Sequence, residues 1–172
     1  MKAELINFFN NLDNSELDGW LLKGDSSCII IIDAIQHSKK ISGQICEIGV
    51  YKGKSLSLLS HLIRNNEKLI GYDLFPAEDY ITTKKILKKY GSQVNIELIK
   101  KDINAITIEE IKSTFEEKSI RMLHIDAGHE YFEVEYLTQD VVYKAVPNRD
   151  ENTRQNAPSL MRPFVAARRF TV

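Results

Sequence analysis

The sequence has few cysteines, no long apolar run and no excess charge of either sign. Its two cysteines, Cys28 and Cys46, lie in apolar stretches, so we expect buried, reduced thiols. The longest apolar run, residues 28–32, is five residues long, whereas a helix needs roughly 18–20 to span a bilayer. A formal net charge of -1 gives no electrostatic basis for binding nucleic acid or an anionic membrane. These absences predict a cytoplasmic protein without nucleic-acid or membrane partners.

The composition changes near residue 147. Residues 1–146 contain 16 Lys and 2 Arg, whereas residues 147–172 contain no Lys and 5 Arg. No Ile follows Ile125 and no Gly follows Gly128. We therefore expect residues 1–146 to form one domain, with residues 1–40 as its helical N-terminal part. Residues 147–172 are expected to be an atypical tail that is not the native ending of the fold.

Strand and helix patterns alternate along the first part of the chain. Four short apolar segments, residues 44–48, 69–74, 94–99 and 120–125, are separated by helical patterns at residues 54–63, 80–90 and 107–118. Nearly continuous apolar strands are typical of a sheet that is buried on both faces. The pattern predicts an α/β fold with a mainly parallel sheet and helices on both faces. Ligands of such folds bind where the carboxyl ends of the strands meet.

Four acids lie at or just beyond these strand ends: Glu47, Asp73, Asp102 and Asp126. A sulfonium cofactor carries a cationic amine, which Glu47 can hold electrostatically. Asp73 can accept hydrogen bonds from ribose hydroxyls, because a carboxylate offers two acceptor oxygens and no donor. Asp102 can lie near the adenine. The row of acids therefore favours an adenosyl cofactor.

The loop between the first strand and its helix leaves a second interpretation open. Residues 49–55 nearly match a phosphate-binding P-loop, but three residues separate Gly49 from Gly53 where the P-loop has four. Glu47 would also bring a carboxylate toward a polyphosphate. A P-loop-like nucleotide-binding enzyme, with Lys54 on the phosphate, therefore remains the alternative.

Three motifs resemble those of a known family. Residues 47–55 resemble motif I of class I S-adenosylmethionine-dependent methyltransferases, and residues 71–73 resemble the acidic motif that follows it. Residues 125–131 resemble the signature of the macrocin O-methyltransferase and cephalosporin hydroxylase-like branch. The resemblance covers roughly residues 17–140 and implies a Rossmann-like fold. It also implies that S-adenosyl-L-methionine is bound by Glu47, Gly49, Tyr51, Gly53, Ser55, Asp73 and Asp102.

The resemblance also implies a chemistry. Asp126 would bind a divalent cation such as Mg²⁺ beside the acceptor hydroxyl, and His129 would act as a base or a positioning group. The implied reaction is O-methylation of a sugar or a glycosylated small molecule. We expect His37, His61 and His124 to be structural or surface residues.

The family's later features are not found in this sequence. The glycine turn and the strand ending in paired aspartates, which complete the metal site in that branch, have no counterpart after Gly128. We therefore expect the sheet to be incomplete at its C-terminal end. A third interpretation follows, in which the chain is a non-catalytic remnant that retains cofactor binding.

Overall fold

The fold is built on one parallel sheet. A computed structural model describes residues 4–5, 7, 9, 18–19, 21, 23–92, 95–102, 105–115, 120–126 and 164–167. Five strands pair in the order β3-β2-β1-β4-β5, and every pair is parallel. The strands are β1 (Gln44–Ile48), β2 (Leu69–Asp73), β3 (Ile96–Lys100), β4 (Ile120–Ile125) and β5 (Phe164–Ala167).

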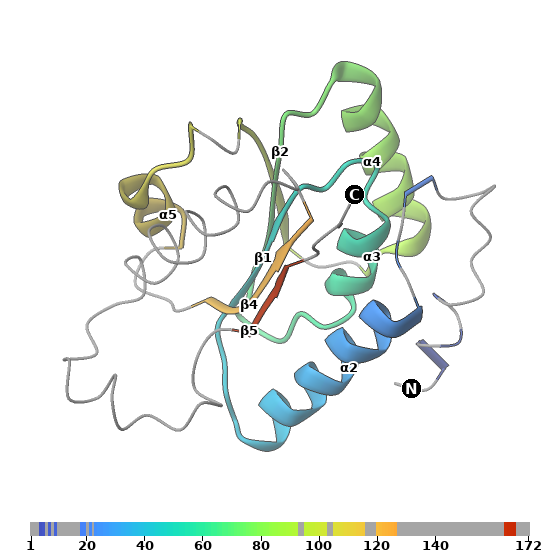
Figure 1. The fold of residues 1–172 in the computed structure, drawn as a ribbon, viewed down its shortest axis with the longest axis vertical. Coiled ribbons are helices and arrows are strands. Elements are labelled where there is room, and N and C mark those ends of the chain that lie inside the picture. The colour runs from blue at the N-terminus through green and yellow to red at the C-terminus, as the bar shows by residue number, and fades with distance from the viewer. Residues whose placement is uncertain are drawn as a thin grey trace.

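Helices cover both faces of this sheet (Figure 1). Three helices, α2 (Lys23–Ser38), α3 (Lys54–Ser60) and α4 (Ala77–Tyr90), lie on one side, and α5 (Ile108–Phe115) lies on the other. Side chains alternate between the two faces of a strand, so the strands β1 to β4 contribute to two apolar clusters. Ile45, Leu69 and Met122 pack with the cluster that includes α3, whereas Cys46, Ile70 and Leu123 pack with the cluster that includes Phe115 of α5. The predicted α/β fold with a parallel sheet is confirmed.

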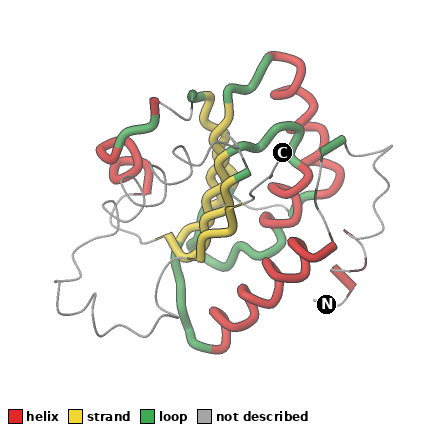
Figure 2. Tube along the Cα trace, viewed as in Figure 1, coloured by secondary structure: helices red, strands yellow, loops and turns green. Residues whose placement is uncertain are grey.

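The strand order reverses direction at β1. The chain runs outward from β1 through β2 to β3, then returns to place β4 on the other side of β1. The tube view shows the strands stacked edge to edge between the helical layers (Figure 2). In open parallel sheets, ligands bind outside the carboxyl ends of the strands at such a reversal. The reversal therefore predicts a ligand site at the carboxyl ends of β1 and β4.

The two arginines of residues 1–146 meet in a buried cluster at the other end of the sheet. Arg121, the second residue of β4, is fully buried and pairs with Asp33 of α2 and with Glu67. Its remaining N–H groups bind Gln36 Oε1 at 2.9 Å and the carbonyl oxygen of Leu62 at 2.6 Å. Arg64 also binds Asp33 Oδ1, at 2.7 Å. The cluster ties α2, β4 and the loop before β2 together through a guanidinium fork that lysine cannot reproduce.

Several boundaries and orientations differ from the sequence expectations. The third strand begins at Ile96 instead of residue 94. The helix predicted over residues 107–118 is described from Ile108 to Phe115, and residues 116–119 lie outside the described residues. Cys28, expected to be buried, is exposed because α2 turns Ile29 and Ile30 inward; Cys46 is buried as expected. After Asp126 the sequence also predicts a helix to about residue 144, and this helix lies outside the described residues.

Part of the predicted tail joins the sheet. Residues 164–167, in the segment predicted as an atypical tail, form β5 and pair with β4. The division at residue 147 itself stays a prediction. Within the described residues, no helix is long and apolar enough to cross a bilayer.

Candidate functional site

Backbone hydrogen bonds bring the ends of β1, β2 and β4 together. The Gly49 N–H donates to the carbonyl oxygen of Tyr72 at 2.8 Å, and the Asp126 N–H donates to that of Ile48 at 2.9 Å. These bonds extend the parallel pairing one residue beyond β1 and β4. The glycine loop, Asp73 and Asp126 therefore lie along one edge of the sheet, as the sequence predicted.

Asp73 braces the glycine loop. Its Oδ2 accepts hydrogen bonds from the backbone N–H groups of Val50 at 2.8 Å and Tyr51 at 2.7 Å, and its Oδ1 accepts one from Phe75 at 3.1 Å. Tyr51 and Phe75 both have positive φ, at 50° and 41°, which is strained for residues with a side chain. The carboxylate holds both residues in place. A carboxylate has about four acceptor positions, so these three bonds leave about one for a ligand hydroxyl instead of the two expected from the sequence.

The two glycines of the loop have conformations that other residues adopt only with strain. Gly49 has φ 89° and Gly53 has φ 86°. A Cβ atom on Gly53 would lie 3.0 Å from Cγ2 of Thr83 in α4. Ser55, in the first turn of α3, is buried directly after this loop. The loop is thus compact, and the side chain of Thr83 fills the space beside Gly53.

Glu47 lies beneath the loop in an apolar strand. It is fully buried, and its Oε1 accepts a hydrogen bond at 2.7 Å from Nδ1 of His124. The two residues face each other across β1 and β4, where Glu47 is in register with His124. Its second oxygen, Oε2, is buried and has no hydrogen-bond partner among the described residues. Buried polar atoms are nearly always paired, so this oxygen marks a place prepared for a donor.

The pKa values of this pair are both shifted upward. Burial raises the pKa of the Glu47 carboxyl, against the opposing effects of the His124 hydrogen bond and charge and of the nearby Ser55 hydroxyl. Burial alone would lower the pKa of His124, but the hydrogen bond and charge of Glu47, with the charges of Asp126 and Asp25, outweigh it and raise the pKa. The hydrogen bond therefore favours the charged form of His124, whereas burial opposes the charged form of Glu47.

The segment before α2 is attached to the outer side of the glycine loop. Asp18 Oδ2 accepts a hydrogen bond from the Tyr51 hydroxyl at 3.1 Å and pairs with Lys52 Nζ at 2.5 Å. Lys54 Nζ donates to the carbonyl oxygen of Gly19 at 3.3 Å. Lys54, the residue that would contact phosphate in a P-loop, is therefore buried against the N-terminal segment. Together with the carboxylate of Glu47 beneath the loop, this arrangement disfavours a polyphosphate ligand.

Of the remaining predicted residues, the structure describes Asp126 and Asp102. Asp126 is partly exposed at the end of β4, and Asp102 is exposed just beyond β3. The Lys101 N–H donates to the carbonyl oxygen of Asp73 at 2.8 Å, which places the end of β3 next to that of β2. His129 lies outside the described residues. Among the described residues, no three His, Cys, Asp or Glu side chains gather into a group that could hold a metal ion. The part of the chain described here therefore does not supply a metal site around Asp126.

His124 pairs with a predicted site residue. It was expected to be structural or at the surface, and it is buried with its Nδ1 on Glu47. The available signal was that Glu47 and His124 are polar residues in otherwise apolar segments next to the glycine loop and Asp126. A buried polar side chain requires a partner, and two such residues in adjacent strands can supply each other's.

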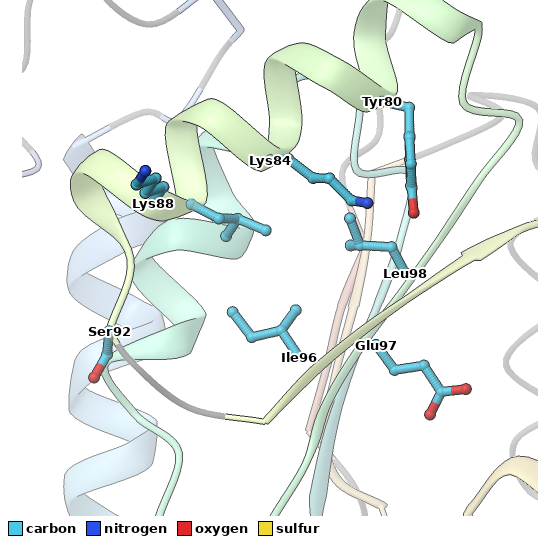
Figure 3. A pocket seen from close by; sticks show the side chains of 8 residues that line it. Tyr80, Lys84, Lys88, Ser92, Ile96, Glu97 and Leu98 are labelled. Atoms are coloured by element: carbon cyan, nitrogen blue, oxygen red, sulfur yellow. The ribbon is translucent and has the colours of Figure 1, made fainter.

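A separate cavity lies between α4 and β3. Its volume is about 480 Å³, and Figure 3 shows Tyr80 and Lys84 pointing from α4 toward Leu98 of β3. It is lined by Tyr80, Lys84, Leu87, Lys88, Ser92, Ile96, Glu97 and Leu98. None of the residues predicted to bind a cofactor is among them. This cavity is therefore distinct from the edge formed by the strand ends.

Solved structures of methyltransferases share this fold. The chain superimposes on a candidate O-methyltransferase from Klebsiella pneumoniae with a TM-score of 0.54 and 12% identity, covering 82% of this chain and 58% of that one. TomG, an O-methyltransferase of tomaymycin synthesis from Streptomyces achromogenes solved in complex with SAM, gives 0.58 and 14%, covering 83% and 60%. A candidate RNA methyltransferase from Pyrococcus horikoshii gives 0.52 and 9%, covering 90% and 77%. The chain thus spans about three fifths of the length of the first two proteins.

The sequence itself gives a more direct assignment. A search of curated proteins finds no match. The sequence profile of a methyltransferase domain, however, matches residues 46–148, a range that begins in β1 and includes the glycine loop, β2, β3 and β4. The chain therefore belongs to the methyltransferase domain family.

Proposed function

We propose that this chain binds S-adenosyl-L-methionine at the carboxyl edge of its sheet and transfers the methyl group to a hydroxyl of a small molecule. One observation carries the proposal. At the strand-order reversal, the fully buried carboxylate of Glu47 has an oxygen with no hydrogen-bond partner among the described residues, next to the glycine loop. An acid placed in this way suits the cationic amino group of the cofactor and opposes a polyphosphate.

Each predicted binding residue has a physical role in this proposal. Glu47 and Asp126 provide negative charge beside the cationic amino group of the cofactor. Gly49 and Gly53 let the backbone approach the cofactor closely. Asp73 uses its remaining acceptor position for one ribose hydroxyl while it holds the loop in shape. Tyr51, Ser55 and Asp102 complete the predicted contacts around the site.

The cofactor supplies an activated methyl group, and the chain's residues have to align the acceptor for in-line attack. Asp126, at the end of β4, lies where it can face both cofactor and acceptor. We propose Asp126 and His129 as the catalytic residues, with His129 receiving or directing the acceptor's proton. A sugar or glycosylated small molecule as acceptor follows from the resemblance at residues 125–131 and is the least constrained part of the proposal.

Assistance by Mg²⁺ is a further part of the sequence prediction. A magnesium site needs several oxygen ligands in octahedral geometry. Within the described ranges, Asp126 has no group of partners that could complete one. In the proposed reaction, the described residues therefore act without a metal ion. Turnover that survives exhaustive chelation would agree with this version, and turnover abolished by chelation and restored by Mg²⁺ would require ligands from the rest of the chain.

The first test of the proposal is thermal unfolding with candidate ligands. S-adenosylmethionine or S-adenosylhomocysteine at one hundred times its Kd stabilises a protein by about 2.7 kcal/mol. For a chain of this size, that corresponds to a rise in Tm of roughly 5 to 10 °C. ATP with Mg²⁺ should leave the Tm unchanged. Stabilisation by ATP alone would favour the nucleotide-binding alternative, and no stabilisation by any of them would overturn both.

A pair of matched variants tests whether Glu47 carries the binding. Glu47→Gln removes the charge, and we expect affinity for S-adenosylhomocysteine to fall about 10- to 100-fold, as for loss of a charged hydrogen bond. Glu97→Gln makes the same change on β3, beside the separate cavity, and should leave affinity unchanged. Equal affinities in both variants would contradict the assignment of Glu47. Binding without turnover would instead support the interpretation of a non-catalytic remnant.

A further inference from the structure

The buried pair of Glu47 and His124 lies at the strand-order reversal of the sheet. The two side chains come from adjacent strands, β1 and β4, and their residues are direct partners in the parallel register. Nδ1 of His124 donates to Oε1 of Glu47 at 2.7 Å. The side chains are 8% and 0% exposed, for His124 and Glu47 respectively. The hydrogen bond is therefore shielded from water and fixes the carboxylate in one orientation.

Only half of the Glu47 carboxylate is used by the described residues. Oε1 is bound by His124, whereas Oε2 is buried and has no partner in the described part of the chain. Leaving a buried acceptor unpaired is unfavourable, so such an atom in a stable core points to a ligand that pairs with it. The pair lies directly beneath the glycine loop, next to Asp126 at the end of β4.

We propose that His124 is a positioning residue, which holds Oε1 of Glu47 so that Oε2 faces the amino group of the cofactor's amino-acid moiety. This inference rests on the proposed function. Without the Nδ1 donor, the carboxylate could rotate or exchange its two oxygens, and the acceptor for the ligand would no longer be held in one place. His124 would then determine how strongly the site distinguishes ligands that carry the amino-acid group from ligands that lack it.

Two ligands separate this role from a purely structural one. S-adenosylhomocysteine carries the amino-acid group, whereas 5′-methylthioadenosine has the same nucleoside and sulfur without it. We expect His124→Leu to lower the affinity for S-adenosylhomocysteine about 10- to 100-fold and to leave the affinity for 5′-methylthioadenosine within about twofold of its original value. Titration calorimetry measures both affinities. A purely structural role would lower the affinity for both ligands by the same factor.

Conservative variants test the geometry of the donor. His124→Asn places an amide N–H near the position of Nδ1 and should retain most of the preference for S-adenosylhomocysteine. His124→Gln places its amide farther out and should lose the preference. This pair decides the question even if His124→Leu does not fold. Leu123→Val, a change on the opposite face of β4, is the control and should lower Tm without changing the ratio of the two affinities.

The outcomes are distinct. A selective loss in His124→Leu with retention in His124→Asn supports the inference. An equal loss for both ligands, or equal behaviour of the Asn and Gln variants, overturns it while leaving the proposed function in place. If the unmodified chain binds neither ligand, the proposed function fails and this inference fails with it.

Discussion

Replacing Arg121 by methionine should strongly destabilise the fold without altering the site. Methionine fills similar space but leaves Asp33 and Glu67, both buried, without their shared cation. Removing one partner of a buried ion pair typically costs about 3 to 5 kcal/mol. Two features reduce the loss: Asp33 keeps Arg64 at 2.7 Å, and Glu67 keeps the backbone N–H groups of Gly43 and Arg64. We therefore expect Arg121→Met to lower the free energy of unfolding by about 3 kcal/mol.

That loss is large relative to the whole stability of a domain, which is about 5 to 15 kcal/mol. It corresponds to a fall in Tm of roughly 6 to 12 °C for a chain of this size. Urea unfolding followed by far-ultraviolet circular dichroism measures the change in the free energy of unfolding. The matched control is Arg64→Met, whose side chain is 22% exposed, so we expect a smaller loss of about 1 to 2 kcal/mol.

The location of the cluster provides a second readout. Arg121 lies at the amino end of β4, and the candidate site lies at the carboxyl end of the same strand. Under conditions where Arg121→Met remains folded, its affinity for S-adenosylhomocysteine should match that of the unmodified chain. A change in unfolding free energy below about 1 kcal/mol would refute the reasoning about buried charge. A loss of affinity as large as the loss of stability would refute the separation of the two ends.

Two further predictions concern packing and thiol chemistry. A Cβ atom on Gly71 would lie 2.8 Å from Cγ2 of Val50. Gly71→Ala should therefore lower the free energy of unfolding in urea by about 1 to 3 kcal/mol and lower the affinity for S-adenosylhomocysteine. An unchanged stability would show that the loop has room to move. Native protein should react with a thiol reagent at Cys28 and not at Cys46, because Cys28 is exposed and burial raises the pKa of the Cys46 thiol; equal labelling of the two before denaturation would contradict the burial.

The strands could be predicted from the sequence because burial on both faces requires a recognisable apolar run. Residues 44–48 and 120–125 were predicted with the bounds that the structure has. Helix faces were harder to predict. Ile81, in the helix predicted over residues 80–90, is 53% exposed, because α4 presents Thr83 and Ile86 to the core. Gly91 follows this helix with φ -80°, and a Cβ there would lie 2.6 Å from the carbonyl oxygen of Leu87.

The site was predictable in position but not in its internal contacts. Acids at strand ends and a glycine loop indicate the edge where a ligand binds, because the topology of a parallel sheet brings them together. Which polar groups then pair depends on register and on side-chain orientation. Glu47 and His124 are 77 residues apart, and Asp73 binds backbone groups 22 and 23 residues earlier. The sequence predicted Asp73 as a ligand for ribose, but it could not show that three backbone N–H groups of the loop and of Phe75 already donate to this carboxylate.

The most direct test of the central claim is the location of ligand-induced changes in amide chemical shifts on adding S-adenosylhomocysteine. Binding at the strand ends predicts the largest changes at residues 49–53, 73–75 and 126. These residues include the backbone N–H groups that bind the Asp73 carboxylate and the carbonyl oxygen of Ile48. Residues lining the cavity between α4 and β3 should change little (Figure 3). Changes centred on Lys84, Lys88 and Leu98 with none in the glycine loop would contradict the account.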